Sequence, residues 1–399
     1  MRDLNQYRES MLKCSWCEFC QATCPIYLED LLETHVARSR LNLIRMCLLE
    51  KTLPRSDRFK EIVDRCLCCT NCSQTCPAKI PVEEMVMAAR SILYQGKRRN
   101  PLQRALLRRF MEQRGLGKAM AAMQSLAAAL GFSFEEVPAI TAAPFLDQPR
   151  GRVPAVGETR GRVAYFVGCA TNSFYPGTAE DVVGVLTRNG LEVMIPEGLV
   201  CCGLPALAEG DFDTAEELAR KNYPVLTALE ADAILTDCTS CGMTLKSKAM
   251  KVLPDQDPLR LKAELLAPKV WEVTDYLNQI GLSSPPSALP KKFTYHAPCH
   301  RGWTNTLTAA PINLLAKVPG AELIELEYPQ RCCGAGGAFS LEHPDLSRRI
   351  RAKKIEDILQ TGAKTVLTQC PACRSFLIPA LPEHTVLHPI SFLARAYVD

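Results

Sequence analysis

The sequence predicts two kinds of structure in one chain: a helical module, and after it two copies of an α/β domain. Half of the 20 cysteines lie in the first hundred residues, where apolar side chains recur at helical spacing. After residue 150, short apolar runs alternate with amphipathic segments, which is typical of parallel strands joined by helices. The cysteine pattern of this second part occurs twice. The predicted class is therefore α plus α/β, with an internal repeat.

Length and composition limit what kind of protein this can be. A chain of 399 residues is too long for one ordinary core, so we expect several domains. Its 47% hydrophobic and 23% charged residues are typical of a globular protein. The formal net charge of +4 is small, and the sequence contains no strongly basic domain with a motif that recognises nucleic acid. This composition argues against nucleic acid as a partner.

Two segments bear on the cellular location. The first eleven residues are polar and charged, without the apolar core of a secretory signal. The most apolar stretch outside the expected core, residues 119–130, is well short of the ~20 residues that a membrane helix needs. We expect a cytoplasmic protein, at most peripheral on the cytoplasmic face of the inner membrane. In that reducing compartment, clustered cysteines indicate metal sites rather than disulfides.

The first module, predicted over residues 1–97, contains the pattern C-x2-C-x2-C-x3-C-P twice. In this pattern three cysteines bind one 4Fe-4S cluster, and the fourth binds the other cluster. One cluster is assigned the ligands Cys14, Cys17, Cys20 and Cys76, and the other the ligands Cys66, Cys69, Cys72 and Cys24. Structural zinc also takes four thiolates, but its ligand pairs are usually separated by longer loops, so clusters are favoured. Cys47 and Cys68 are left over, and we expect small buried hydrophobic side chains at both positions.

A segment without cysteines, residues 98–150, separates the first module from the repeated part. It is rich in Arg and Ala and then contains Pro138, Pro144 and Pro149, which favours a helical linker with an extended end. A domain boundary is therefore predicted near residue 150. The two repeated domains are predicted at residues 151–285 and 286–399.

The repeat is visible in both the cysteines and their surroundings. The first copy contains Cys169, the run Cys201-Cys202-Gly203, and the pair Cys238 and Cys241. The second copy contains Cys299, the run Cys332-Cys333-Gly334, and the pair Cys370 and Cys373. Residues 233–238 also match residues 365–370, and residues 270–277 match 386–393. The two segments are therefore two copies of one domain.

Each cysteine group of a copy follows a predicted strand, at residues 163–167, 191–195 and 233–235 in the first copy. The carboxyl ends of parallel strands line one crevice, so the five cysteines should meet there. Five thiolates exceed the four of a tetrahedral zinc site, which leaves zinc as the weaker alternative. His296 and His300 flank Cys299 and could be ligands, but we expect hydrogen-bonding neighbours. The glycines of residues 334–337 lack a full nucleotide-binding motif and more simply allow backbone to come close to the site.

This arrangement resembles the CCG domain family of heterodisulfide reductase subunits, of anaerobic glycerol-3-phosphate dehydrogenase, and of the iron-sulfur subunits of glycolate oxidase and D-lactate dehydrogenase. The long helical interval between residues 24 and 66 also resembles the helical ferredoxin domains of respiratory dehydrogenases. The order of modules is most similar to the glycolate oxidase and D-lactate dehydrogenase iron-sulfur subunits. The resemblance implies one noncubane 4Fe-4S cluster in each copy, held by Cys169, Cys201, Cys202, Cys238 and Cys241, and by Cys299, Cys332, Cys333, Cys370 and Cys373.

The same resemblance implies a function. The chain would be the electron-transfer subunit of a flavoprotein complex that oxidises a 2-hydroxy acid such as glycolate or D-lactate. No flavin or nicotinamide domain is evident, so oxidation would take place on an FAD-containing partner, and no catalytic residue is assigned here. Electrons would pass to quinone, an electron-transfer flavoprotein or another carrier. The alternative is a heterodisulfide reductase-like subunit that reduces a thiol-cofactor disulfide at a noncubane cluster.

Overall fold

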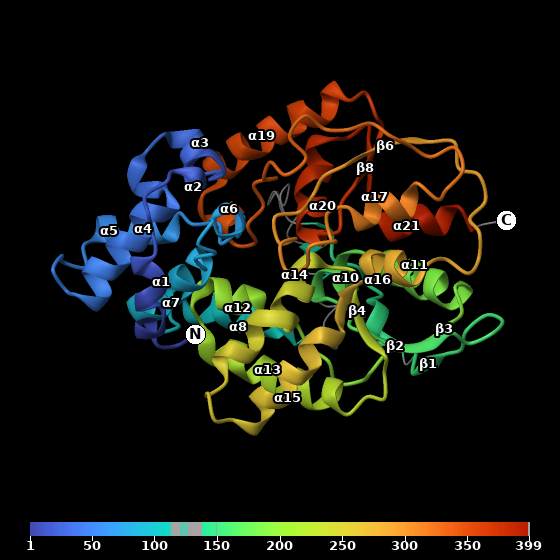
Figure 1. Ribbon diagram of the computed structural model, residues 1–399, viewed down its shortest axis with the longest axis horizontal. Helices are drawn as coiled ribbons and strands as arrows, with labels where there is room; N and C mark the ends of the chain where they lie inside the picture. Colours follow the sequence, from blue (N-terminus) through green and yellow to red (C-terminus); the bar gives the residue numbers. More distant parts are fainter. Residues whose placement is uncertain (113–120, 123, 126–137, 149, 398–399) are drawn as a thin grey trace.

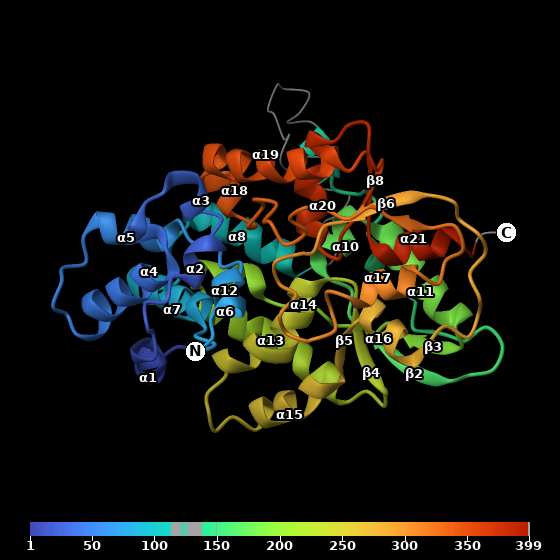
Figure 2. The ribbon, with the colours of Figure 1, turned by 45° about the horizontal axis from the view of Figure 1, so that its top comes forward.

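The computed structural model describes residues 1–112, 121–122, 124–125, 138–148 and 150–397. A helical module formed by the N-terminal part lies at one end of the molecule, and two α/β units form the rest (Figure 1). Figure 2 shows the helical module at the same end of the molecule, beside the α/β units. Among the described residues, no helix is both long enough and apolar enough to cross a membrane.

The N-terminal module is almost entirely helical, as the apolar periodicity predicted. Its α-helices are α1 (Arg8–Leu12), α2 (Phe19–Ala22), α3 (Tyr27–Asp30), α4 (Ala37–Ile44), α5 (Asp57–Asp64), α6 (Asn71–Thr75) and α7 (Val82–Tyr94). A π-helical turn over Arg45–Leu49 continues α4, and 3-10 turns occur at Leu4–Tyr7 and Glu33–His35. The Ser56 hydroxyl accepts a hydrogen bond from the Phe59 amide and so caps the start of α5. Helix α7 passes through the centre of the module with Met85 and Val86 fully buried.

The predicted linker begins with a helix, α8 (Pro101–Met111), which Asn100 caps through its side chain. A 3-10 turn follows at Phe145–Asp147. Most of the apolar stretch at residues 119–130 lies outside the described residues, whereas the end of the linker is described over residues 138–148.

The first α/β unit contains a five-stranded sheet in the order β1-β3-β2-β4-β5, in which only β1 is antiparallel to its neighbour. Its strands are β1 (Arg152–Val153), β2 (Gly161–Tyr165), β3 (Leu191–Met194), β4 (Ala233–Thr236) and β5 (Val270–Glu272). Its helices are α10 (Cys169–Phe174), α11 (Pro176–Arg188), α12 (Leu204–Glu209), α13 (Phe212–Thr227), α14 (Thr239–Met243), α15 (Pro258–Leu266) and α16 (Val273–Ile280). A π-helical turn at Thr244–Lys248 continues α14, and 3-10 turns occur at Ala249–Val252 and Ala267–Lys269.

The second unit repeats this plan with a fully parallel sheet in the order β7-β6-β8-β9. Its strands are β6 (Lys292–Tyr295), β7 (Glu322–Leu323), β8 (Thr365–Leu367) and β9 (Thr385–Leu387). Its helices are α17 (Ala310–Leu315), α18 (Phe339–Glu342), α19 (Pro344–Gln360), α20 (Pro371–Leu377) and α21 (Pro389–Arg395), with a 3-10 turn at Ile378–Ala380. The order β7-β6-β8-β9 corresponds to β3-β2-β4-β5, which confirms that the fold is duplicated.

The units pack closely on one another. Helix α11 packs on α21, and α16 on α17, so one apolar core contains residues of both sheets, such as Val163 and Phe293. A second core joins the helical module to the first α/β unit and includes Met85 and Phe212. Gly210, with φ of +75°, lies against α7 so closely that a Cβ there would be 2.4 Å from the Ser91 nitrogen. Only glycine fits this contact.

Candidate metal centres

The two cysteine motifs of the helical module fold into loops of the same shape. Trp16 and Glu18 in the first loop have φ of 59° and 68°, and the corresponding Cys68 and Thr70 in the second loop have φ of 50° and 62°. Left-handed residues are uncommon outside glycine, so their repetition at matching positions marks a shared requirement. Alternating backbone of this kind turns amide N–H groups toward one point, which suits an anionic group such as a thiolate-bound cluster.

The two loops differ in their surroundings. Cys17 is the one exposed cysteine of the 20, all of which the structure describes. Trp16 and Phe19 beside it are also more than half exposed, at 54% and 58%. In the second loop, Cys68 and Thr70 are buried against the second α/β unit. The first loop therefore lies on the surface, and the second is packed against the second α/β unit.

The structure brings cysteines of the two motifs together across the module. Helix α2, which carries Cys20, packs on α6, and Cys76 directly follows α6. In the other direction, Cys24 of the first motif is near enough to Cys69 and Cys72 to contribute to the raised pKa of both thiols, after the larger effect of burial. These contacts agree with exchanged fourth ligands. The assignment of each ligand stays a prediction.

Burial makes several of these thiols unfavourable as free ions. It raises the pKa of Cys69, Cys72 and Cys299 well above the ordinary value near 9. A metal bound to sulfur replaces the proton and so removes this obstacle to ionisation. The concentration of buried thiols in a few places therefore fits metal clusters, and it fits disulfides poorly because all 20 cysteines are free.

Arg90, a buried arginine that no sequence motif singles out, lies beside the second loop. The Arg90 guanidinium donates hydrogen bonds to the carbonyl oxygens of Cys66 at 2.7 Å and Ala208 at 2.6 Å, and it lies 3.5 Å from the Cys68 sulfur. The Cys68 amide in turn donates to the Cys66 sulfur at 3.4 Å. Arg90 thus ties the loop to the first α/β unit and places a positive charge beside the sulfurs of Cys66 and Cys68. Cys68 and Cys47 are both buried, as expected for small hydrophobic side chains.

The five cysteines of the first copy follow the carboxyl ends of β2, β3 and β4, where the sequence placed them. The Cys169 and Cys201 sulfurs are 3.3 Å apart. Cys241 interacts with the side chains of Cys202 and Cys238, which closes the group. Gly168 also packs at this point, since a Cβ there would lie 3.0 Å from the Cys241 sulfur. Every member of this set is buried.

The second copy forms the matching group. The Cys333 and Cys373 sulfurs are 3.2 Å apart, and the Gly334 amide donates to the Cys332 sulfur at 3.3 Å. Gly334 has φ of +88°, and a Cβ on it would lie 2.5 Å from the Ser347 carbonyl oxygen. The glycine after the cysteine pair therefore permits a close backbone contact, as its position predicted.

The two groups and the second loop of the helical module are neighbours. Cys238 of the first copy interacts with the Cys370 side chain of the second, and next to them the Thr239 amide donates to the Gln369 carbonyl at 3.1 Å. On the other side, Thr70 and Gln74 side chains donate to the Cys299 carbonyl at 3.1 and 2.7 Å. The second copy's cysteine loops therefore contact both the second loop of the helical module and the first copy's cysteines.

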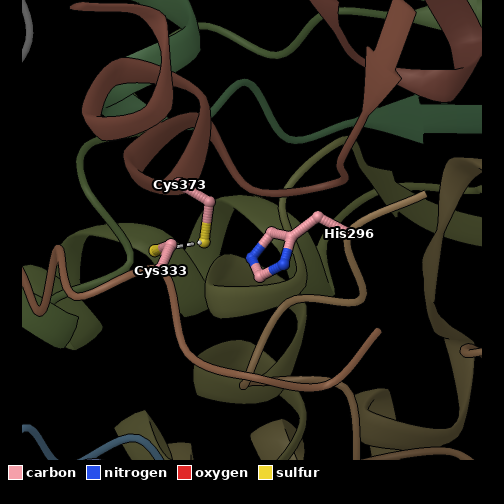
Figure 3. A group of neighbouring side chains, drawn as sticks. All are labelled: His296, Cys333 and Cys373. Carbon is pink, nitrogen blue, oxygen red and sulfur yellow. Dashed lines mark hydrogen bonds between the residues drawn. The ribbon is translucent and has the colours of Figure 1, made fainter. Parts of the chain in front are cut away.

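The two histidines beside Cys299 have different surroundings. The His300 ring lies 2.8 Å from the Ser240 hydroxyl through Nδ1 and 3.0 Å from the Cys68 carbonyl through Nε2, so both nitrogens have protein partners. His300 is thus the hydrogen-bonding neighbour that was expected, and it joins three parts of the chain. Neither nitrogen of His296 has a partner among the described residues. Figure 3 shows the His296 ring beside Cys333 and Cys373.

Comparisons with known proteins agree with these sites. The family described as a cysteine-rich domain (CCG) matches residues 163–246 and 293–378, and the 4Fe-4S dicluster domain matches residues 10–80. The chain is 25% identical to the probable glycolate oxidase iron-sulfur subunit of Bacillus subtilis, over 92% of this chain and 90% of that protein. It is 28% identical to the glycolate oxidase iron-sulfur subunit of Escherichia coli, over 97% of this chain and 95% of that protein.

A shorter relative has a higher identity over about half of this chain. Lactate utilization protein A of Shouchella clausii is 35% identical, over 51% of this chain and 85% of that protein. Some archaeal iron-sulfur proteins that match are longer, and the chain covers 50% and 43% of two of them. The chain therefore belongs to the CCG-domain iron-sulfur protein family of the glycolate oxidase iron-sulfur subunits and lactate utilization protein A, and it is an iron-sulfur electron-transfer protein.

Proposed function

We propose that this chain is the electron-transfer subunit of a complex whose FAD-containing partner oxidises a 2-hydroxy acid such as glycolate or D-lactate. Electrons from the partner's flavin pass through the chain to quinone, an electron-transfer flavoprotein or another carrier. The names of the two full-length relatives and of lactate utilization protein A support this substrate class and a flavoprotein partner.

The observation that carries the proposal is the contact between successive cysteine groups. Thr70 and Gln74, beside the second loop's cysteines, hold the Cys299 carbonyl of the second copy. The second copy in turn meets the first copy where Cys370 lies beside Cys238. Iron-sulfur clusters bound at these places accept and release one electron at a time. The protein's part is to keep the groups in contact and away from water.

The burial of the groups favours a conduit over a disulfide reductase. A reductase needs an opening through which a substrate sulfur can reach the metal site. All five cysteines of the first copy are buried, and four of the second copy are buried too, whereas Cys299 is half-buried. Trp303 packs on Gly242 in α14, next to Cys241. The heterodisulfide reductase-like alternative is therefore less supported.

We also propose the ligands and domain limits predicted from the sequence. Each motif cysteine of the helical module would belong to one of two cubane 4Fe-4S clusters, with Cys24 and Cys76 exchanged. Each five-cysteine group would hold one noncubane 4Fe-4S cluster. The proposed units are residues 1–97, 98–150, 151–285 and 286–399. Their support is the thiol contacts and the two sheets described above.

Rapid mixing tests the conduit. The anaerobically reconstituted complex of this chain with its flavoprotein is mixed with glycolate or D-lactate, and cluster absorbance is followed. We expect bleaching without any added disulfide, and no oxidation of either acid by the isolated chain with an artificial acceptor. Cys370→Ser alters a proposed cluster ligand. Its control is Cys47→Ser, which alters a buried cysteine outside the groups.

Two results would contradict the conduit. One is clusters that stay oxidised in the presence of acid and reduced flavoprotein, while the dithionite-reduced chain alone reduces a thiol-cofactor disulfide. That result would establish the reductase in its place. The other is rapid turnover of a 2-hydroxy acid by the pure, flavin-free chain.

A further inference from the structure

We propose that His296 donates a ring N–H hydrogen bond to a sulfur of the cluster held by the second copy's cysteines, and so gives that cluster a higher reduction potential than the first copy's. This inference rests on the proposed cluster at this site. It does not depend on the 2-hydroxy acid or on the flavoprotein partner.

The position of the ring is the first observation. His296 is 1% exposed, and neither ring nitrogen has a hydrogen-bond partner in the part of the chain that the structure describes. A ring nitrogen of His296 and the sulfurs of Cys333 and Cys373 all lie within 4.8 Å of one another (Figure 3). A buried N–H without an acceptor is rare in proteins. The nearest chemistry that can accept it is the sulfur of this group.

The chemistry of the ring agrees with a hydrogen-bond donor. An imidazole ring carries at least one N–H in either protonation state, which is enough for the proposed bond.

The first copy provides an internal comparison, because phenylalanine occupies the matching position. The Phe166 amide donates to the Leu235 carbonyl at 2.8 Å, and the His296 amide donates to the Leu367 carbonyl at 2.9 Å. These two carbonyls belong to β4 and β8, which correspond in the two sheets. Phe166 is also fully buried but has no polar hydrogen. The repeat therefore places a donor beside one cysteine group and an apolar ring beside the other.

The residues before this position show that the match is close. Tyr165 donates through its hydroxyl to Asp237 at 2.8 Å, and Tyr295 donates in the same way to Gln369 at 2.6 Å. Asp237 and Gln369 each directly precede a ligand cysteine. The two copies therefore share the tyrosine contact, with Asp237 as acceptor in one and Gln369 in the other, and at the next residue they differ as Phe166 and His296.

The direction of the effect follows from charge. Reduction adds negative charge to a cluster, and a hydrogen bond to sulfur stabilises that charge, so such bonds are among the features that set the potential. A donor in one copy only would make the two CCG sites unequal. An electron shared between them would then reside preferentially on the second copy's site, next to the helical module.

Exchanging the two side chains tests the inference. The full-length chain with reconstituted clusters is titrated with dithionite and mediators, and the transitions are followed by electron paramagnetic resonance together with iron content. In His296→Phe, one transition should move to lower potential, by about tenfold in the equilibrium constant, which is about 59 mV for one electron. In Phe166→His, a different transition should move to higher potential. His296→Gln retains an N–H donor and should lie between the wild type and His296→Phe.

The outcomes separate the possible roles. Unchanged iron with these shifts supports a hydrogen-bond donor. Loss of about four irons in both His296→Phe and His296→Gln would show that His296 is a ligand or a requirement for assembly, and would overturn the proposal. So would full iron content with all transitions unmoved in both His296→Phe and Phe166→His. Because no partner or acid is present, failure of the proposed conduit would leave these results unaffected.

Discussion

Lys248→Met should destabilise the protein strongly, because it removes the charge at the contact between the helical module and the first α/β unit. The Lys248 ammonium lies 2.7 Å from a Glu83 carboxylate oxygen and 3.2 Å from one of Glu84. The three side chains are between 4% and 7% exposed. Burial alone opposes the charge on Lys248, but the two carboxylates outweigh it and hold its pKa above the ordinary value.

The size of the effect follows from the loss of a partner inside the protein. Removing one member of a buried ion pair costs about 3–5 kcal/mol, because the remaining charge has no compensation. Lys251 lies 2.7 Å from Glu84 but is 37% exposed, so it does not replace the charge beside Glu83. Lys251→Met, which removes a partly exposed charge and leaves Lys248 beside Glu84, should cost about 0–1 kcal/mol and is the matched control.

Urea unfolding under anaerobic conditions measures the difference. With a slope of about 3 kcal/mol per molar urea, the midpoint should fall by about 1–1.7 M in Lys248→Met and by at most about 0.3 M in Lys251→Met. Circular dichroism and cluster absorbance are followed together, because coincident transitions are needed for this comparison. Adding Glu83→Gln and Glu84→Gln to Lys248→Met should recover part of the loss, since no buried carboxylate is then left without a partner. Equal midpoints for the two lysine variants, or no recovery with glutamine, would refute the reasoning.

Three further predictions concern the metal content, the packing and the pH dependence. Anaerobic wild-type protein should contain about sixteen irons by chemical analysis, and Cys370→Ser about twelve, whereas Cys47→Ser should match the wild type. A wild-type content near eight irons would contradict the presence of clusters in the CCG domains. Gly242→Ala should cost about 1–3 kcal/mol in urea unfolding, because its Cβ would lie 2.3 Å from a ring atom of Trp303, and an unchanged midpoint would contradict that packing. Burial opposes the charge on Glu84, but the neighbouring lysines lower its pKa to about 2, so its contribution is complete above about pH 4.5 and is lost as pH falls toward 2. The acid unfolding profile of Glu84→Gln should therefore be flatter than that of the wild type by up to about 3 kcal/mol, and identical profiles would contradict this pairing.

The positions of the strands could be predicted closely because their signal is local. Apolar runs at residues 163–167, 191–195 and 233–235 became β2 (Gly161–Tyr165), β3 (Leu191–Met194) and β4 (Ala233–Thr236). Each run ends at a cysteine group, so the rule for parallel strands also predicted that Cys169 and Cys201 would meet. The duplication then extended the same prediction to the second copy.

The contacts between units could not be predicted in this way. No motif in the sequence around Arg90 in α7 predicts its hydrogen bonds to the Cys66 and Ala208 carbonyls. The hydrogen bond from the Thr239 amide to the Gln369 carbonyl joins the two copies. The sequence pattern of each copy does not predict how the two copies are oriented. His296 and His300 are four residues apart and look alike in sequence, but only packing gives His300 two hydrogen-bond partners and places His296 beside Cys333 and Cys373.

The two cysteine loops of the helical module have the same backbone shape but different surroundings. The second loop contacts the Cys299 loop through Thr70. The first loop has the same left-handed backbone at Trp16 and Glu18, with the exposed Cys17 between them. A molecule that touches this surface therefore touches the cysteine loop itself, without a separate recognition element between them. The same loop shape therefore forms an internal contact in one motif and an exposed surface in the other.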